Sequence, residues 1–172
     1  TYIYDGNSGP LDIVNGIDLA GEGGMVWTKK RASDNHYLAD TVQGRSKTIS
    51  PNSTAIPLVS PATYDYKSFN SNGYTLGTAY NMNLVASGSP YVSWTFRKAA
   101  KFFTIVEFTA DETFMDIAHD LGSMPGFVIY KCLTSTTDTT AGSWQCWNSG
   151  MGNNDAIVLN TDAAEVGSAG YI

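Results

Sequence analysis

The chain has 172 residues, of which 42% are apolar and only 15% are charged, and its formal net charge is −6. This length suits one domain or two small ones and is enough to bury a substantial core. Polarity carried by Gly, Ser, Thr and Asn favours an extracellular or particle-borne β protein over a helical cytosolic enzyme. The acidic balance argues against a nucleic-acid partner, and no apolar run reaches the roughly 18 residues of a membrane span.

Strand signals dominate the N-terminal part of the chain. A short apolar run at residues 25–28 follows a glycine, which predicts a central strand that is buried on both faces. Residues 34–42 have some helical spacing, but their later counterpart in the sequence is strand-like. We therefore predict a strand at 34–42 as well.

A hairpin is predicted in the middle of the chain, because Asn72-Gly73 tolerates the positive φ angles of a type I′ turn. A turn centred on these two residues places Phe69 opposite Leu76. The hairpin thus fixes the expected register as well as the turn.

Two further strands are predicted after this hairpin. Residues 91–97 alternate in polarity, with the larger apolar side chains on one face, and residues 104–108 mix β-branched and aromatic side chains. The larger apolar side chains define the predicted core, in which we expect four residues to be almost fully buried: Trp27, Trp94, Phe96 and Val128.

The C-terminal part of the chain repeats the N-terminal part. Residues 19–29 correspond to residues 121–131, which lie 102 positions later, and residues 44–55 correspond to 152–163, which lie 108 positions later. The second copy therefore carries a six-residue insertion near 134–142. Because equivalent sequences occupy equivalent positions in a repeated fold, 25–28 and 127–130 are expected to form equivalent strands.

The predicted fold class is all-β, an antiparallel sandwich or jelly roll, because many short strands alternate with turn signals about every ten residues. The first β repeat is predicted at 1–101 and the second, incomplete one at 102–172. The second copy either completes a shared sandwich or belongs to a longer chain. It lacks a counterpart of 91–97, so we expect an unpaired edge that a partner covers.

The two cysteines, Cys132 and Cys146, flank the insertion and lack metal-ligand spacing. If the loop is a hairpin tip centred on Thr139, they face each other as a cross-strand pair. A disulfide and two buried free thiols both remain open.

Several segments resemble, in order and spacing, a family of repeat domains in virion proteins of marine and cyanobacterial tailed bacteriophages. They are Gly24 to Arg31, His36 to Gly44, Ser50 to Ala55, Ser68 to Gly77, Tyr91 to Ala99, Ile117 to Gly126 and Trp144 to Asn148. The chain departs from the family pattern at Gln43, where an Arg is usual, and at Trp147-Asn148, where the pattern has Tyr-His. The resemblance implies a concanavalin-A-like sandwich and a place on the surface of the virion.

No catalytic, cofactor or metal residues are predicted. His36 and His119 do not lie in a nucleophile pattern, and the carboxylates Glu107, Asp111, Glu112 and Asp116 suit a solvated turn. Exposed aromatic side chains mark binding surfaces. The weak candidates for a ligand platform are Trp147 and Asn148, which precede a glycine-rich turn.

The resemblance implies the function of a non-enzymatic structural protein of a bacteriophage virion, as a tail-fibre or capsid-surface component. Its expected partners are other virion proteins and further copies of itself in a homo-oligomer. The alternative is a lectin-like receptor-binding module that recognises host surface glycans, and a third possibility is a depolymerase that degrades them.

Overall fold

The computed structural model describes residues 1–32, 34–61, 63–78, 80–85, 90–111, 115–134, 142–153, 155–162, 164 and 166–167. The chain divides into two compact units, described separately below. The first consists of Thr1–Thr48 and Leu58–Ser123, and the second of Ile49–Pro57 and Met124–Ile172. The unit boundary and the predicted repeat boundary at 101/102 rest on different criteria, namely packing and sequence similarity, so the repeat division stays a prediction.

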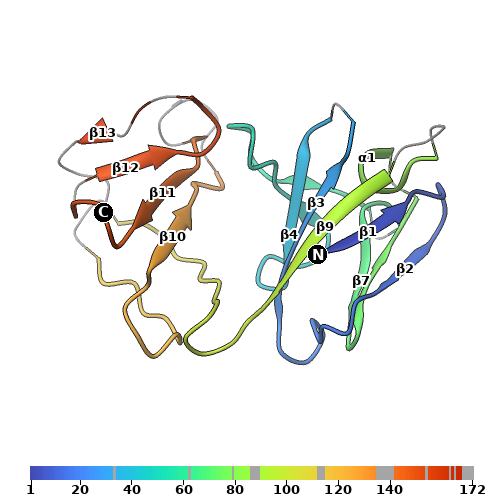
Figure 1. Ribbon diagram of the computed structural model, residues 1–172, viewed down its shortest axis with the longest axis horizontal. Coiled ribbons are helices and arrows are strands. Elements are labelled where there is room, and N and C mark those ends of the chain that lie inside the picture. The colour runs from blue at the N-terminus through green and yellow to red at the C-terminus, as the bar shows by residue number, and fades with distance from the viewer. Residues whose placement is uncertain are drawn as a thin grey trace. The chain divides into compact units, whose positions relative to one another are not determined.

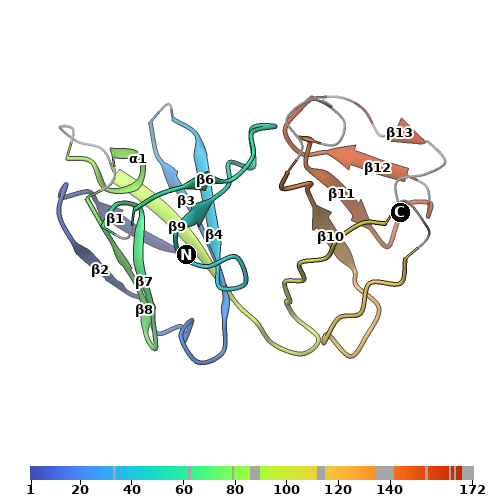
Figure 2. The same ribbon diagram turned by 180° about the vertical axis from the view of Figure 1, so that it is seen from behind.

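The first unit contains two antiparallel sheets (Figures 1 and 2). The larger sheet has the order β1-β9-β3-β4, built from Tyr2–Asp5, Pro90–Arg97, Gly24–Lys30 and His36–Asp40. The smaller sheet has the order β2-β8-β7, built from Leu11–Val14, Gly73–Leu76 and Tyr66–Asn70. A short pair, β5 (Lys47–Thr48) and β6 (Leu58–Val59), and one helical turn, α1 (Tyr80–Asn83), complete its regular structure among the described residues.

The second unit contains one sheet with the order β10-β11-β12-β13. Its strands are Phe127–Tyr130, Gln145–Asn148, Asp155–Val158 and Val166–Gly167, and all the pairings are antiparallel. The prediction of an all-β antiparallel fold is therefore confirmed, and so is the predicted strand in 34–42, which is β4. Residues 104–108 were predicted as a strand, and this was wrong, because they form no regular element.

The repeat is preserved in the pairing of its strands. In the first copy Met25 lies opposite Asp40, and in the second copy Phe127 lies opposite Asn148. These positions correspond under the sequence offsets of 102 and 108. The turns also agree: Thr41 N donates to Gly24 O at 3.0 Å, and its counterpart Ser149 N donates to Gly126 O at 3.0 Å. The expectation that 25–28 and 127–130 form equivalent strands is thus confirmed.

The core of the first unit is rich in tyrosine. It lies where the two sheets face each other, and it consists of Tyr4, Ile13, Leu19, Val26, Tyr37, Ala39, Tyr66, Tyr74, Leu76, Met82 and Tyr91. The Thr28 hydroxyl and the Tyr66 hydroxyl are hydrogen bonded at 2.8 Å and join β3 of one sheet to β7 of the other. This pair satisfies two buried polar groups, as a low-dielectric interior favours, whereas the buried Tyr74 hydroxyl and Ser93 Oγ find no hydrogen-bond partner among the described residues.

The predicted core residues were wrong. Trp27, Trp94, Phe96 and Val128 are all only half-buried. On β9 the buried residues are Tyr91 and Ser93, so the tyrosine and serine face the core while the tryptophan and phenylalanine lie on the opposite face. Residues 25–28 and 127–130 are likewise not buried on both faces.

The predicted register of the central hairpin was also wrong by two positions. Phe69 lies opposite Tyr74 and Asn70 opposite Gly73, so the turn residues are Ser71 and Asn72. Gly73 belongs to β8, where a Cβ would come within 1.9 Å of the Ile13 carbonyl oxygen. This glycine is required by the close approach of β2, not by the turn.

Candidate functional site

The outer face of the larger sheet carries a half-buried aromatic cluster, which we call the aromatic face (Trp27, His36, Trp94, Phe96 and Phe103). Trp27 and Trp94 are cross-strand partners whose rings meet edge to face at a centroid distance of 6.1 Å. Phe96 packs on Phe103 at 5.6 Å. Such pairs add stability beyond the area they bury.

His36 is held in one tautomer on this face. The Trp27 indole N–H donates to His36 Nδ1 at 3.0 Å, so the neutral imidazole carries its proton on Nε2. Burial, followed by the charge of Lys29, lowers the pKa of His36 below its usual value. The ring is therefore neutral at neutral pH and acts as a hydrogen-bond acceptor within the cluster.

A cleft of about 450 Å³ lies beside the aromatic face in the first unit. It is lined by residues that follow Phe96 and Phe103 in the chain and by a second irregular segment, namely Lys98, Thr104, Ile105, Val106, Glu107, Ala118, His119 and Asp120. We call it the Lys98–Asp120 cleft. Polar groups of both charges surround a short apolar patch.

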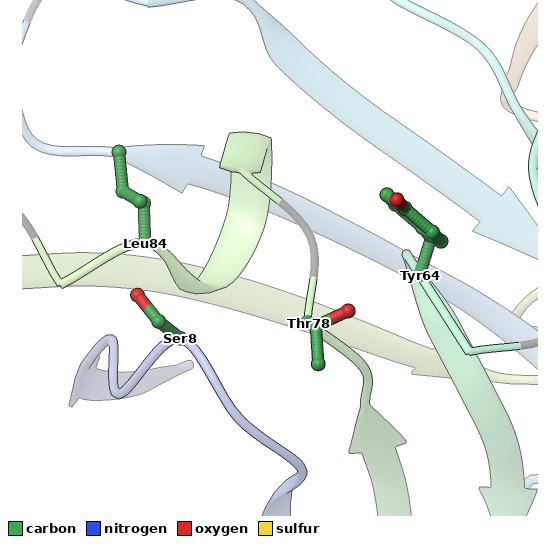
Figure 3. A pocket seen from close by; sticks show the side chains of 4 residues that line it. All are labelled: Ser8, Tyr64, Thr78 and Leu84. Carbon is green, nitrogen blue, oxygen red and sulfur yellow. The ribbon is translucent and has the colours of Figure 1, made fainter.

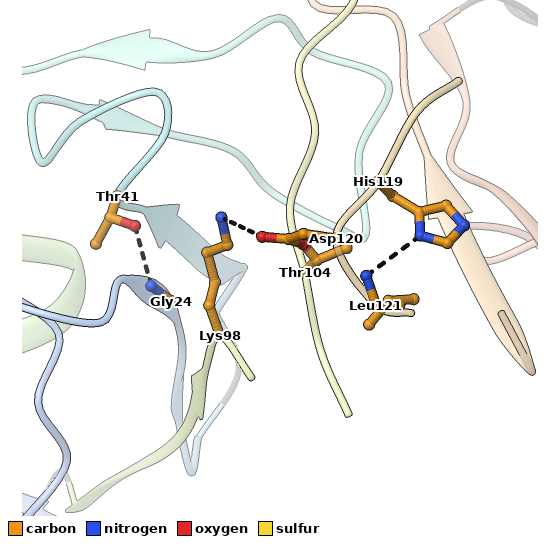
Figure 4. Close-up of polar contacts among 7 residues, drawn as sticks. All are labelled: Gly24, Thr41, Lys98, Thr104, His119, Asp120 and Leu121. Atoms are coloured by element: carbon orange, nitrogen blue, oxygen red, sulfur yellow. Dashed lines mark hydrogen bonds and ion pairs between the residues drawn. The ribbon is translucent and has the colours of Figure 1, made fainter. Parts of the chain in front are cut away.

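Asp120 is the centre of the polar contacts in this cleft (Figure 4). Its carboxylate accepts a hydrogen bond from the Thr104 hydroxyl and lies 3.5 Å from Lys98 Nζ. The hydrogen bond from Thr104 and the charge of Lys98 lower the pKa of Asp120 below its usual value. Beside it, Leu121 N donates to His119 Nδ1 at 3.3 Å, which leaves Nε2 of the neutral ring as a donor.

The arrangement in this cleft suits binding better than nucleophilic catalysis. The Thr104 hydroxyl donates to a carboxylate whose lowered pKa makes it a weak base, so this contact does not activate the hydroxyl. An ammonium group, carboxylates and an imidazole can together donate to and accept from a ligand that carries several hydroxyl groups.

A second, smaller pocket of about 280 Å³ lies elsewhere in the first unit and is lined by Ser8, Tyr64, Thr78 and Leu84 (Figure 3). Two of its polar groups serve the backbone. The Ser8 hydroxyl accepts from Val85 N at 2.7 Å, and the Thr78 hydroxyl donates to Thr63 O at 3.3 Å. Both hydroxyl groups are thus engaged by the backbone, and we do not consider this pocket a ligand site.

The predicted ligand platform lies at the end of β11 in the second unit. Trp147 is half-buried, and its indole N–H donates to Gly152 O at 3.1 Å. The Asn148 side chain accepts from Gly150 N at 2.9 Å. Both polar groups therefore organise the turn after β11, and the platform stays a prediction.

The predicted cross-strand thiol pair is not formed. Cys146 lies opposite Ile129, and neither cysteine forms a disulfide; Cys146 is buried and Cys132 is half-buried. The β10–β11 hairpin keeps the register of its counterpart in the first copy, and this register does not centre the hairpin on Thr139. The tip itself, 135–141, lies outside the described residues, and so does Glu112 among the predicted carboxylates.

Residues 107, 111 and 116 are exposed, and of these only Glu107 lines the Lys98–Asp120 cleft. Within the described ranges, no group of three or more His, Cys, Asp or Glu residues is placed to hold a metal ion. The described part of the chain also contains no helix that is long and apolar enough to cross a membrane.

Sequence reasoning missed the cleft itself. It considered Glu107 apart from His119 and Asp120, because they lie in segments without periodicity, and His119 and Asp120 are distant in sequence from Lys98 and Thr104. The one usable signal was the alternation in β9, which places Lys98 on the same side of the strand as Trp94 and Phe96.

Comparison with known proteins gives a family but no activity. No curated protein and no solved structure matches the chain. The model of one family matches the whole of residues 1–172, and its description, a domain of unknown function (DUF7483), states no role. The chain therefore belongs to the DUF7483 family.

Proposed function

We propose that this chain is a non-enzymatic structural protein of a bacteriophage virion, acting as a tail-fibre or capsid-surface component. The observation that carries the proposal is the duplicated hairpin, in which β3–β4 and β10–β11 share one register. Tandem copies of one β unit suit extended assemblies, since repeated units can pack against neighbours in equivalent ways. The resemblance to phage virion repeats supports the same role.

The direct test is to find the protein in purified particles. Gradient-purified virions are analysed by mass spectrometry, and antibodies against the recombinant chain are used to label intact particles in electron micrographs. Stoichiometric presence with labelling at the tail or the capsid surface supports the proposal. The proposal is contradicted if the protein is found only in the lysate, or if the antibodies label disrupted particles but not intact ones.

A second candidate function is glycan binding, which the Lys98–Asp120 cleft favours. The cleft combines an ammonium group, two carboxylates and an imidazole with a small apolar patch, and half-buried tryptophans lie on the adjoining sheet face. Polar groups that converge in a cleft can orient a sugar while apolar surface covers its faces.

A glycan array on the recombinant chain separates the two functions. Specific binding by the wild-type chain that is lost in the Asp120→Asn variant favours glycan binding. The matched control is Glu22→Gln, because Glu22 pairs with Arg97 at the same 3.5 Å distance as Asp120 with Lys98 but lies outside the cleft. A fall in the mass of a bacterial polysaccharide during incubation would instead reveal a depolymerase.

A further inference from the structure

β10 is the outermost strand of its sheet in the second unit, and within the described residues no strand pairs with its outer side. Two of its side chains are unusually open for apolar residues: Phe127 is 59% exposed and Ile129 is 38% exposed. An apolar, unpaired edge of this kind is a template for pairing with another chain.

The first repeat shows what this edge of the hairpin accepts. There β3, the counterpart of β10, pairs on its other side with β9 in antiparallel orientation. Met25 lies opposite Phe96 and Trp27 opposite Trp94, so apolar side chains cover the residues that correspond to Phe127 and Ile129. Nothing equivalent covers β10 among the described residues.

The repeat also identifies the backbone groups at the free edge. Gly24 O accepts from Thr41 N, and Gly126 O accepts from Ser149 N, so Gly24 and Gly126 direct their backbone groups into their own hairpins. Along an antiparallel strand, the backbone N–H and C=O groups of successive residues point to opposite sides of the strand. Phe127 and Ile129 therefore point their N–H and C=O groups outward, as Met25 and Trp27 do toward β9.

The edge lacks the usual protection. Charged side chains, lysine above all, normally keep exposed edges apart. The nearest one, Lys131, is turned back into its own unit, where its ammonium group donates to Thr54 O at 3.1 Å and to Gly142 O. The same group lies over the Trp144 ring, 5.9 Å from the centroid.

We infer that β10 pairs antiparallel with β10 of a second copy of this chain across a two-fold axis, forming a continuous sheet through a symmetric dimer. A two-fold axis supplies the antiparallel neighbour that the first repeat shows at this edge. With the axis beside Val128, Phe127 of each copy faces Ile129 of the other. These residues carry the outward backbone groups, so both hydrogen bonds form at each pair. The inference does not depend on the virion assignment.

The test compares the wild-type chain with Ile129→Pro by sedimentation equilibrium from about 1 µM to about 1 mM, the range of weak to moderate protein association. Proline removes an outward N–H from each copy but leaves the bonds to β11 in place. We expect a wild-type dimer whose dissociation constant rises roughly thirty-fold in the variant, as for two lost hydrogen bonds. A second variant, Ile129→Lys, keeps the N–H and adds the missing edge charge, so it is also expected to weaken the dimer.

The matched control is Ile3→Pro. Ile3 is an exposed isoleucine on β1, the edge strand of the larger sheet, and its backbone groups point away from β9 because those of Tyr4 pair with Tyr91. This variant should dimerise like the wild type. Hydrogen exchange provides a second measurement, in which protection of residues 124–131 should rise with protein concentration. A wild-type monomer at the highest concentration overturns the inference. So does a dimer that survives both Ile129 variants or that Ile3→Pro breaks equally.

Discussion

The tyrosine core predicts that this protein loses stability in alkali above about pH 10. Tyr4, Tyr66 and Tyr74 are almost completely buried, and burial is the largest cause that raises the pKa of each above the ordinary 10.0. For Tyr74 the value reaches about 12. The folded protein therefore keeps these three phenols protonated at a pH where the unfolded chain ionises them.

The direction of the effect follows from the raised pKa. Below pH 10 the phenols are neutral in both states, and the free energy of unfolding does not depend on them. As the pH rises above 10, the unfolded chain releases protons that the folded protein keeps, so the stability falls until the pH passes the folded pKa. Each such tyrosine costs about 1.4 kcal/mol at pH 11, and three cost about 4 kcal/mol. That is a large part of the total stability of a typical domain.

The assay is guanidinium unfolding followed by tryptophan fluorescence at pH 8, 9, 10 and 11, alongside absorbance at 295 nm to count ionised tyrosines. We expect the free energy of unfolding to be constant up to about pH 9.5 and to fall steeply above pH 10. Tyr66→Phe provides the control. It removes the hydrogen bond to Thr28 and should cost about 1–2 kcal/mol at pH 8, but it should reduce the alkaline slope by about 1.4 kcal/mol per pH unit. Titration of all the tyrosines near pH 10 in a protein that stays folded would refute the reasoning.

Three further outcomes follow from the same packing. Trp94→Ala should lower the free energy of unfolding in urea by about 2 kcal/mol, less than the 3–5 kcal/mol of a core aromatic residue, because Trp94 is half-buried and packs edge-on against Trp27. A loss above about 4 kcal/mol would mean that Trp94 behaves as a core residue. Asn83→Ala should cost about 3 kcal/mol, because the buried Asn83 side chain accepts from Asn7 N at 2.9 Å and donates to Gly77 O at 2.8 Å; an unchanged melting temperature would contradict this. Iodoacetamide mass spectrometry should label Cys132 faster than Cys146, because Cys146 is buried and its pKa is raised by burial; a disulfide, or equal rates, would oppose it.

The main strands of the repeated hairpin and of β9 were predictable, but the faces that they bury were not. In β9 one set of alternating residues is Val92, Trp94 and Phe96, and the other contains Tyr91 and Ser93. Hydropathy favours burying the first set, yet the structure buries the second. The reason is a tertiary one: the Tyr91 ring stacks on Tyr4 at a centroid distance of 5.3 Å, and its hydroxyl accepts from Leu84 N at 3.1 Å. No pattern within a single strand carries that information.

The predicted registers of the hairpins were wrong for a related reason. The glycine of Asn72-Gly73 was read as a turn residue, whereas packing against Ile13 requires it. The pairing of Cys146 with Ile129 repeats the pairing of Leu38 with Trp27 in the first hairpin. Once one register was known, the sequence repeat alone would have supplied the other. The Lys98–Asp120 cleft was beyond reach, because irregular segments form it and no periodic signal joins them.

The segment 49–57 shows how one side chain can hold a loop. Trp144 is 7% exposed, and its indole N–H donates to Ser50 O at 3.0 Å. Trp144→Phe removes this donor and keeps most of the ring, while Ser50 O still accepts from Ser53 N at 3.1 Å, so the cost is that of one hydrogen bond, about 1 kcal/mol. We expect amide exchange in 49–57 to accelerate roughly five-fold, while exchange in β3 and β9 stays unchanged. Trp147→Phe is the matched control, since its indole donates at 3.1 Å to Gly152 O within the turn after β11. Acceleration of 49–57 by both variants, or by neither, would mean that the Trp144–Ser50 hydrogen bond does not hold this segment.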